Sequence, residues 1–206
     1  MEPDRGAGWW GLMTGLKKLL SVKATEKRGA LPSAYQQVEY IKSTGTQYII
    51  LTNTFYTGQK FLLDCQSDST TSTTVIFGYS AAAGFWFGTV SGKYSVTNGE
   101  FNNVSITDRI QAELTYTETL LSVSINGISR SSTLAGTRRS LSLCAGEGGS
   151  AWYGSTVKIF GLRSDGIYDL IPCYRKSDGE IGMYNTVDGV FFTNSGTGEF
   201  IKGPDV

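Results

Sequence analysis

The chain has 206 residues, enough for a single all-β domain with a full core. Glycine is abundant, at 26 residues, and proline is scarce, at 4, which is typical of many short strands joined by tight turns. Because 18 basic residues balance 18 acidic ones, no net charge attracts nucleic acid, and we expect no nucleic-acid partner. The chain has no histidine, which excludes Ser-His and Cys-His nucleophile systems within it.

The first 30 residues differ in composition from the rest and are predicted to form an N-terminal arm. Six basic and three acidic side chains give this leader a net charge of +3, so the remainder carries −3. Its apolar residues recur at helical spacing, with a lysine pair on another face, as an amphipathic helix requires. Two glycines weaken such a helix by about 1 kcal/mol each relative to alanine. The residues predicted to dock are Trp9, Trp10, Met13, Leu16, Leu19 and Leu20.

The leader does not have the features of a signal peptide, because its start is acidic, lysines interrupt its apolar run and no small-residue cleavage site follows. It is also too short and too charged to span a bilayer. A tryptophan-containing apolar stripe suits either an arm that docks into a neighbouring subunit or a helix that lies in a membrane interface. We favour the docking arm, and packing of the leader on its own domain is the structural alternative.

From Leu31 onward the chain alternates apolar and polar residues with a period of two, which predicts short strands. Turn residues separate these strands at intervals of about ten residues, a spacing that favours a sandwich over a parallel sheet. The clearest hairpin signal is Asn126-Gly127, which predicts a type I′ turn after an alternating strand. The predicted strands cover residues 48–51, 61–65, 74–77, 85–87, 109–116, 120–125, 141–144 and 156–162.

The three cysteines, Cys65, Cys144 and Cys173, are odd in number and far apart, with no CxxC pair. Each falls in an apolar, strand-like run, so we predict buried free thiols rather than a disulfide or a reactive nucleophile. This pattern is typical of a chain made in a reducing cytoplasm.

Two segments bracket this body. VEYIKSTGTQYI runs from Val38 to Ile49, and PCYRKSDGE begins at Pro172 in a stretch that ends with FFTNSGTGEF at Phe200. Both resemble the opening and closing segments of concanavalin A-like, laminin G-like modules of gut-bacterial phages and surface proteins. The related openings continue with an aspartate where this chain has Ile50. The resemblance implies an all-β jelly-roll sandwich of two antiparallel sheets over residues 31–206, with residues 1–30 as the arm.

The two segments themselves are predicted to be structural, with turns at residues 44–46 and 177–179. Glycosidases of the resembled fold carry an E-x-D-x-x-E or E-x-D-x-E run on one strand, where alternate carboxylates share a face. This chain has no such run, since Glu113 and Glu118 have no aspartate between them. We therefore expect no enzymatic activity.

Laminin G-like modules often hold one Ca²⁺ at a rim, and Asp68 and Asp108 are the loop carboxylates here that suit such a role. Isolated loop aspartates are more often turn formers, so we expect no cofactor and no metal. For sugar binding the useful residues are aromatics on glycine- and serine-rich loops. The candidates for a carbohydrate site are Trp152, Tyr153, Trp86 and Tyr79, with Tyr94 as a further aromatic.

These features lead to one functional prediction and one alternative. By resemblance, the chain is a non-catalytic phage virion protein, either a capsid decoration protein or a component of a head or tail fibre. The leader would anchor it to other virion proteins or to further copies of itself, and loop aromatics would bind host surface carbohydrate. The alternative is a bacterial surface lectin-like module whose leader lies in a membrane interface.

Overall fold

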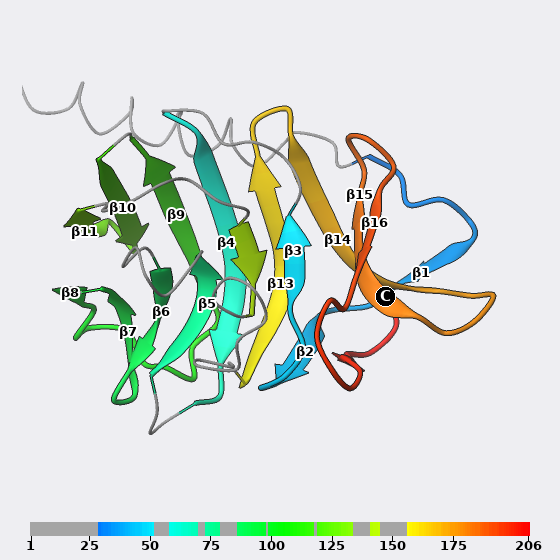
Figure 1. Cartoon of the computed structure of the whole chain (residues 1–206), viewed down its shortest axis with the longest axis horizontal. Helices are drawn as coiled ribbons and strands as arrows, with labels where there is room; N and C mark the ends of the chain where they lie inside the picture. Colours follow the sequence, from blue (N-terminus) through cyan, green and yellow to red (C-terminus); the bar gives the residue numbers. More distant parts are fainter. Residues whose placement is uncertain are drawn as a thin grey trace, which may run out of the picture.

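In a computed structural model, two antiparallel sheets pack face to face around one core (Figure 1). The structure describes residues 29–51, 58–69, 73–78, 86–97, 99–117, 119–133, 141–144 and 156–206. All the predicted docking residues of the leader lie outside these ranges. Over the described ranges the regular secondary structure is entirely β, which confirms the predicted all-β class with two antiparallel sheets. No helix in these ranges has the length and hydropathy needed to cross a membrane.

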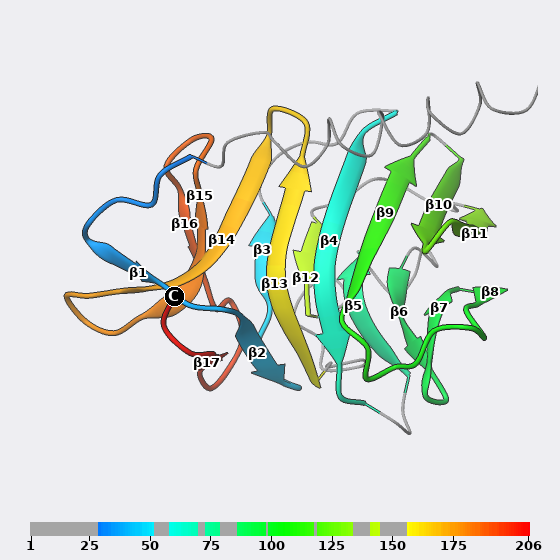
Figure 2. The same ribbon diagram turned by 180° about the vertical axis from the view of Figure 1, so that it is seen from behind.

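The larger sheet has eleven strands, and eight of them follow one another in the order β11-β10-β9-β4-β13-β14-β15-β16 (Figure 2). β1 pairs with β14, while β2 pairs with both β13 and β17. The strands are β1 (Tyr35–Gln37), β2 (Ile41–Thr44), β4 (Lys60–Ser67), β9 (Ile110–Tyr116), β10 (Leu120–Ile125), β11 (Ile128–Thr133), β13 (Thr156–Ser164), β14 (Tyr168–Arg175), β15 (Ile181–Asn185), β16 (Phe191–Thr193) and β17 (Ile201–Lys202).

The smaller sheet has six strands in the order β3-β12-β5-β6-β7-β8 and faces the central strands of the larger one. Its strands are β3 (Ile49–Leu51), β5 (Thr74–Gly78), β6 (Trp86–Val90), β7 (Lys93–Val96), β8 (Gly99–Glu100) and β12 (Leu141–Leu143). All eight predicted strand segments therefore correspond to strands, and no end differs from its predicted position by more than three residues. The sequence prediction missed β1, β2, β7, β8, β15, β16 and β17, and it indicated β11 and β14 only through the Asn126-Gly127 hairpin and the strand-like run around Cys173.

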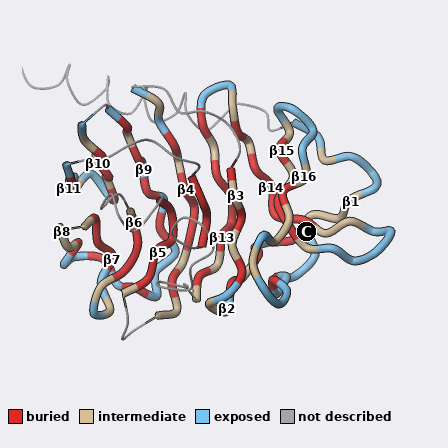
Figure 3. Tube along the Cα trace, in the orientation of Figure 1, coloured by how far each residue is buried: buried red, intermediate tan, exposed pale blue. Residues whose placement is uncertain are grey.

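The core lies between the sheets and follows the predicted alternation. In β9, buried and exposed residues alternate from Ile110 to Leu114, and β10 alternates buried with half-buried residues (Figure 3). The predicted type I′ turn between β10 and β11 is confirmed, because Asn126 and Gly127 both have positive φ, at 51° and 79°. A bulge between β4 and β13 lies at Phe160, where the register shifts between Ile159 and Gly161.

The three cysteines are buried and free, as predicted. Burial raises the pKa of the Cys65 and Cys144 thiols well above the ordinary value, and it raises that of Cys173 to about 12.

Because the thiolate is the reactive form, we expect the native chain at pH 8 to react with iodoacetamide at least about a hundredfold more slowly than an unfolded chain. The measurement is the mass increase over time, with and without denaturant. Rapid labelling of one thiol in the native protein would contradict the buried placement.

One end of the larger sheet, made of β1, β14, β15 and β16, extends beyond the smaller sheet (Figures 1 and 2). There the two family-like segments interlock. Ser195 and Thr197 donate backbone hydrogen bonds to the carbonyls of Tyr48 and Thr46, at 2.8 and 3.2 Å. A side chain at Gly196 would meet the Thr46 carbonyl oxygen at 2.0 Å, so only glycine fits this close approach. The shared function of the two segments is thus to close this end of the fold.

Candidate functional site

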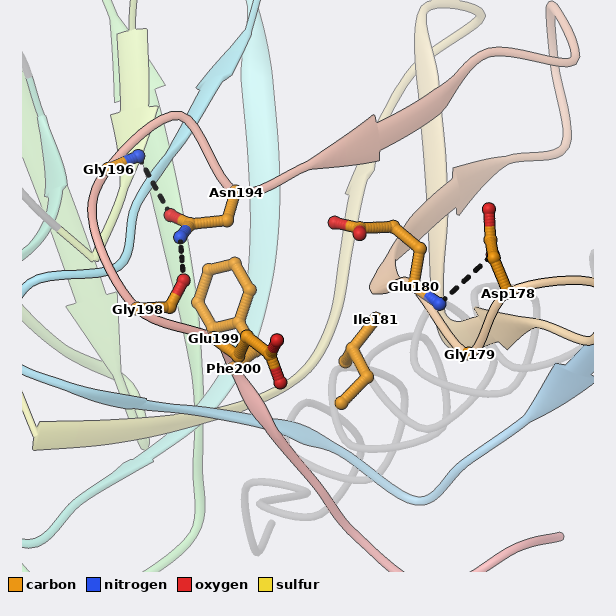
Figure 4. Close-up of a pocket in the computed structure, with 9 residues that line it drawn as sticks. All are labelled: Asp178, Gly179, Glu180, Ile181, Asn194, Gly196, Gly198, Glu199 and Phe200. Carbon is orange, nitrogen blue, oxygen red and sulfur yellow. Dashed lines mark hydrogen bonds between the residues drawn. The ribbon is translucent and has the colours of Figure 1, made fainter.

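A pocket of about 360 Å³ lies at this projecting end of the larger sheet (Figure 4). Two loops of the closing segment form its walls: the turn between β14 and β15, and the loop that follows β16. Its lining residues are Asp178, Gly179, Glu180, Ile181, Asn194, Gly196, Gly198, Glu199 and Phe200.

The first wall is a tight turn held by an ion pair. Arg175 donates two hydrogen bonds to Asp178, from Nε at 2.9 Å and from Nη2 at 2.7 Å. The same carboxylate accepts the backbone N–H of Glu180 at 3.1 Å. These hydrogen bonds, above all that from Arg175, hold the pKa of Asp178 below its ordinary value. Gly179, with φ of 78°, allows the chain to reverse here. The Asp178 carboxylate forms its hydrogen bonds within this turn, to Arg175 and to the Glu180 N–H.

The second wall is organised by Asn194. Its Oδ1 accepts the backbone N–H groups of Tyr48 and Gly196, at 3.1 and 2.8 Å, and its Nδ2 donates to the Gly198 carbonyl at 2.7 Å. Every one of these bonds ends on backbone, and the amide therefore shapes the loop. Asn194 lines the pocket but has little capacity left to bind a ligand.

The floor is apolar, and the rim carries two carboxylates. Phe200 is buried in the core, and Ile181 packs against that core from the pocket side. Glu180 and Glu199 are exposed, and neither carboxylate takes part in a hydrogen bond or an ion pair with another described residue. With Arg175 committed to Asp178, the pocket has a negative rim. Carboxylate oxygens accept hydrogen bonds from hydroxyl groups or ammonium groups, so this rim suits polyhydroxylated or cationic ligands rather than anions.

A second polar cluster lies on the outer face of the larger sheet. Arg109 donates two hydrogen bonds to Asp64, at 2.8 and 2.9 Å, and its guanidinium lies 3.8 Å from the centroid of the Phe160 ring. The bulge in β13 lies within this cluster: Asp64 on β4 pairs with Gly161, the residue after the bulged Phe160. The Tyr40 ring meets Phe160 edge-on at 5.4 Å. The cluster satisfies its own charges and contributes stability.

Of the four aromatic residues predicted to bind carbohydrate, only Trp86 lies in the described ranges, and it does not line the pocket. Tyr79, Trp152 and Tyr153 lie outside the described residues. Trp86 begins β6 on the smaller sheet and is half-buried, while its neighbour Phe87 is fully buried, the alternation expected of a strand. For the further aromatic, Tyr94, a role as a sugar platform is wrong. It is fully buried, and its hydroxyl donates to the carbonyls of Ile106 and Asp108 at 3.1 Å.

The acidic candidates are dispersed. Asp68 forms an ion pair with Lys42 at 2.6 Å, and Asp108 is exposed in the loop before β9. The described ranges contain no group of three or more cysteine, aspartate or glutamate side chains placed to hold a metal ion. Glu113 is exposed on β9. These acidic residues therefore lie apart from one another and do not form a common site.

Glu180 and Glu199 were not predicted as site residues. Both lie inside the closing segment, which the sequence marks as structural, and nineteen positions separate them along the chain. The one available signal was that each follows a glycine in a turn, where a side chain is exposed. In a comparison with known proteins, no protein-family model and no curated protein matches this chain.

Proposed function

We propose that this chain is a non-catalytic surface protein of a phage virion, either a capsid decoration protein or a component of a head or tail fibre. In this proposal the body is a concanavalin A-like jelly-roll sandwich that binds host surface carbohydrate. The leader anchors the protein to other virion proteins or to further copies of the same chain. The virion setting rests on the resemblance of the opening and closing segments, and the two packed antiparallel sheets agree with the fold that the resemblance implies.

The pocket is the observation that carries the binding part of the proposal. Its rim carboxylates, Glu180 and Glu199, are suited to accept hydrogen bonds from sugar hydroxyls, while the half-buried Ile181, with Phe200 buried behind it, provides an apolar surface that a sugar ring can contact. Neutral or amino sugars fit this chemistry better than uronic acids, because a ligand carboxylate would face two like charges. The loop aromatics Trp152 and Tyr153 remain the second proposed contact region.

Binding of the full chain to a panel of bacterial surface polysaccharides tests this function. We expect saturable binding to at least one neutral or amino-sugar polymer, and a loss of about tenfold in affinity for Glu180→Gln with Glu199→Gln. Each lost charge-assisted hydrogen bond is worth about 1.5–3 kcal/mol at most, and both positions are exposed to solvent, which reduces the effect. Isothermal titration calorimetry gives the affinities.

The matched control is Glu113→Gln, an exposed glutamate on β9 that does not line the pocket and should leave affinity unchanged. A Trp152→Ala variant separates the two contact regions. Loss of binding in Trp152→Ala alone would move the site to the loop aromatics. No binding by the wild-type chain across the panel would reject carbohydrate recognition and leave virion assembly as the proposed role.

A further inference from the structure

Two exposed valines and three partly buried rings lie at or beside the β15–β16 hairpin of the projecting end, and we call this group the valine–aromatic patch. Its members are Val187, Val190, Tyr35, Tyr184 and Phe191. Val187 and Val190, in the turn between β15 and β16, are 50% and 43% exposed. The Tyr35 ring lies 4.8 Å from that of Tyr184 and 4.9 Å from that of Phe191, measured between centroids. All three rings are only partly buried.

The described chain begins at this patch. Gly29 packs against Thr186 in the same turn, and a side chain at Gly29 would come within 2.6 Å of the Thr186 Cβ. From there the chain runs to Ala34, whose carbonyl accepts the Lys176 N–H at 2.9 Å, and then to Tyr35 within the patch. Leader residues 1–28 therefore join the domain at the edge of its exposed apolar surface.

The net charges of the two regions also favour contact between the leader and the valine–aromatic patch. Described residues 165–200, which form β14, β15, β16 and their loops, contain six acidic and two basic side chains, a net charge of −4. The leader carries +3, with its lysines next to its apolar residues. The Arg175 guanidinium lies 5.5 Å from the centroid of the Phe191 ring and pairs with Asp178, so the charge beside the rings is balanced. Over the wider region the net charge is negative, and the basic residues of the leader suit that charge as its apolar residues suit the valines and rings.

We propose that the apolar stripe of the leader, from Trp9 to Leu20, docks on the valine–aromatic patch of its own chain. Eight residues, 21–28, connect the two, and a flexible tether of this length spans about 16 Å, so the stripe can return to the patch. Such a tether gives an effective concentration on the order of 1 mM. If the leader binds the patch with an intrinsic Kd of about 0.1 mM, the leader is then bound in about nine chains of ten. This inference concerns the free chain and goes beyond the proposed anchoring role.

Limited trypsin digestion of the full-length chain tests the contact, because the leader offers cleavage sites at Lys17, Lys18 and Lys23. We expect cleavage there to accelerate about tenfold in a Val187→Ser, Val190→Ser variant, in line with the closed fraction. The matched control is Ile201→Ser, which removes an equally exposed apolar side chain (51%) from β17, a strand that pairs with β2. Equal cleavage rates in the wild type and the valine variant would overturn the proposal.

Cross-linking identifies which copy supplies the leader. With cysteines introduced as Met13→Cys and Val190→Cys, a bifunctional maleimide should give a cross-linked monomer at a yield independent of protein concentration. The three native thiols are buried and do not compete. Cross-linked dimers with a concentration-dependent yield would overturn docking within one chain and assign the patch to the leader of a second copy.

Discussion

We expect Gln47→Ala to lower the free energy of unfolding by about 2–4 kcal/mol, because Gln47 joins the opening and closing segments from a buried position. Its Oε1 accepts the Thr44 N–H at 2.7 Å, and its Nε2 donates to the Thr197 carbonyl at 3.2 Å. The side chain is almost fully buried, at 4% exposure. Truncation removes the side-chain acceptor of the Thr44 N–H and opens a cavity between segments that lie 150 residues apart, while the Thr46 hydroxyl still donates to the Thr197 carbonyl at 2.8 Å. Urea denaturation measures the loss.

Gln111→Ala is the matched control. Gln111 is exposed on β9 and makes a single long contact, 3.4 Å from Nε2 to Asp64, so its truncation should change stability by no more than about 0.5 kcal/mol. Equal losses for the two glutamine variants would contradict the view that the interlock closes this end of the fold.

We expect Arg109→Ala to lower stability by about 1–3 kcal/mol. The side chain of Asp64 is only 12% exposed, so removal of the guanidinium leaves a carboxylate with little access to water. The substitution also uncovers Phe160, which is now 7% exposed beneath Arg109. Half of the Arg109 side chain is exposed, and solvent screening keeps the loss below that of a fully buried pair.

Arg175→Ala tests whether burial of the carboxylate, rather than the geometry of the ion pair, determines how much stability is lost. Arg175 holds Asp178 with the same two-nitrogen arrangement, but both side chains are well exposed, at 39% and 48%. Water replaces the lost partner there, and we expect little change in stability. If Arg175→Ala proved as destabilising as Arg109→Ala, then burial of the carboxylate would not explain the effect of Arg109.

Much of the strand content could be predicted from sequence because it depends on near neighbours. Alternation from Ile110 to Leu114 marks a strand with one buried face, and it does so whichever strand lies beside it. Missed strands such as β2 and β17 are too short to show a period, and they exist because β13 and β2 supply their hydrogen-bonding partners. The candidate site was harder to predict, since its two walls meet only when the turn after β14 and the loop after β16 are brought together.

Tyr94 shows why aromatic residues alone did not locate a site. Its neighbours in the sequence are a lysine and a serine, which are compatible with either face of a strand. Which face is buried depends on the sheet that packs opposite. Here β4 of that sheet offers the Ser67 N–H to the hydroxyl, and the loop before β9 offers the carbonyls of Ile106 and Asp108. A ring that satisfies its hydroxyl group inside the core is not available to a sugar.

The sequence by itself determined the all-β class, the Asn126-Gly127 hairpin turn and the burial of the three thiols. Each of these follows from residues within a few positions of one another: a period of two, a pair that tolerates positive φ, and a cysteine within an apolar run. Only the tertiary structure decided that Gln47 holds the closing segment, that Arg109 covers Phe160, and that Glu180 and Glu199 share one pocket. These contacts join residues far apart in the chain, and they depend on strand order and sheet packing, which local patterns do not encode.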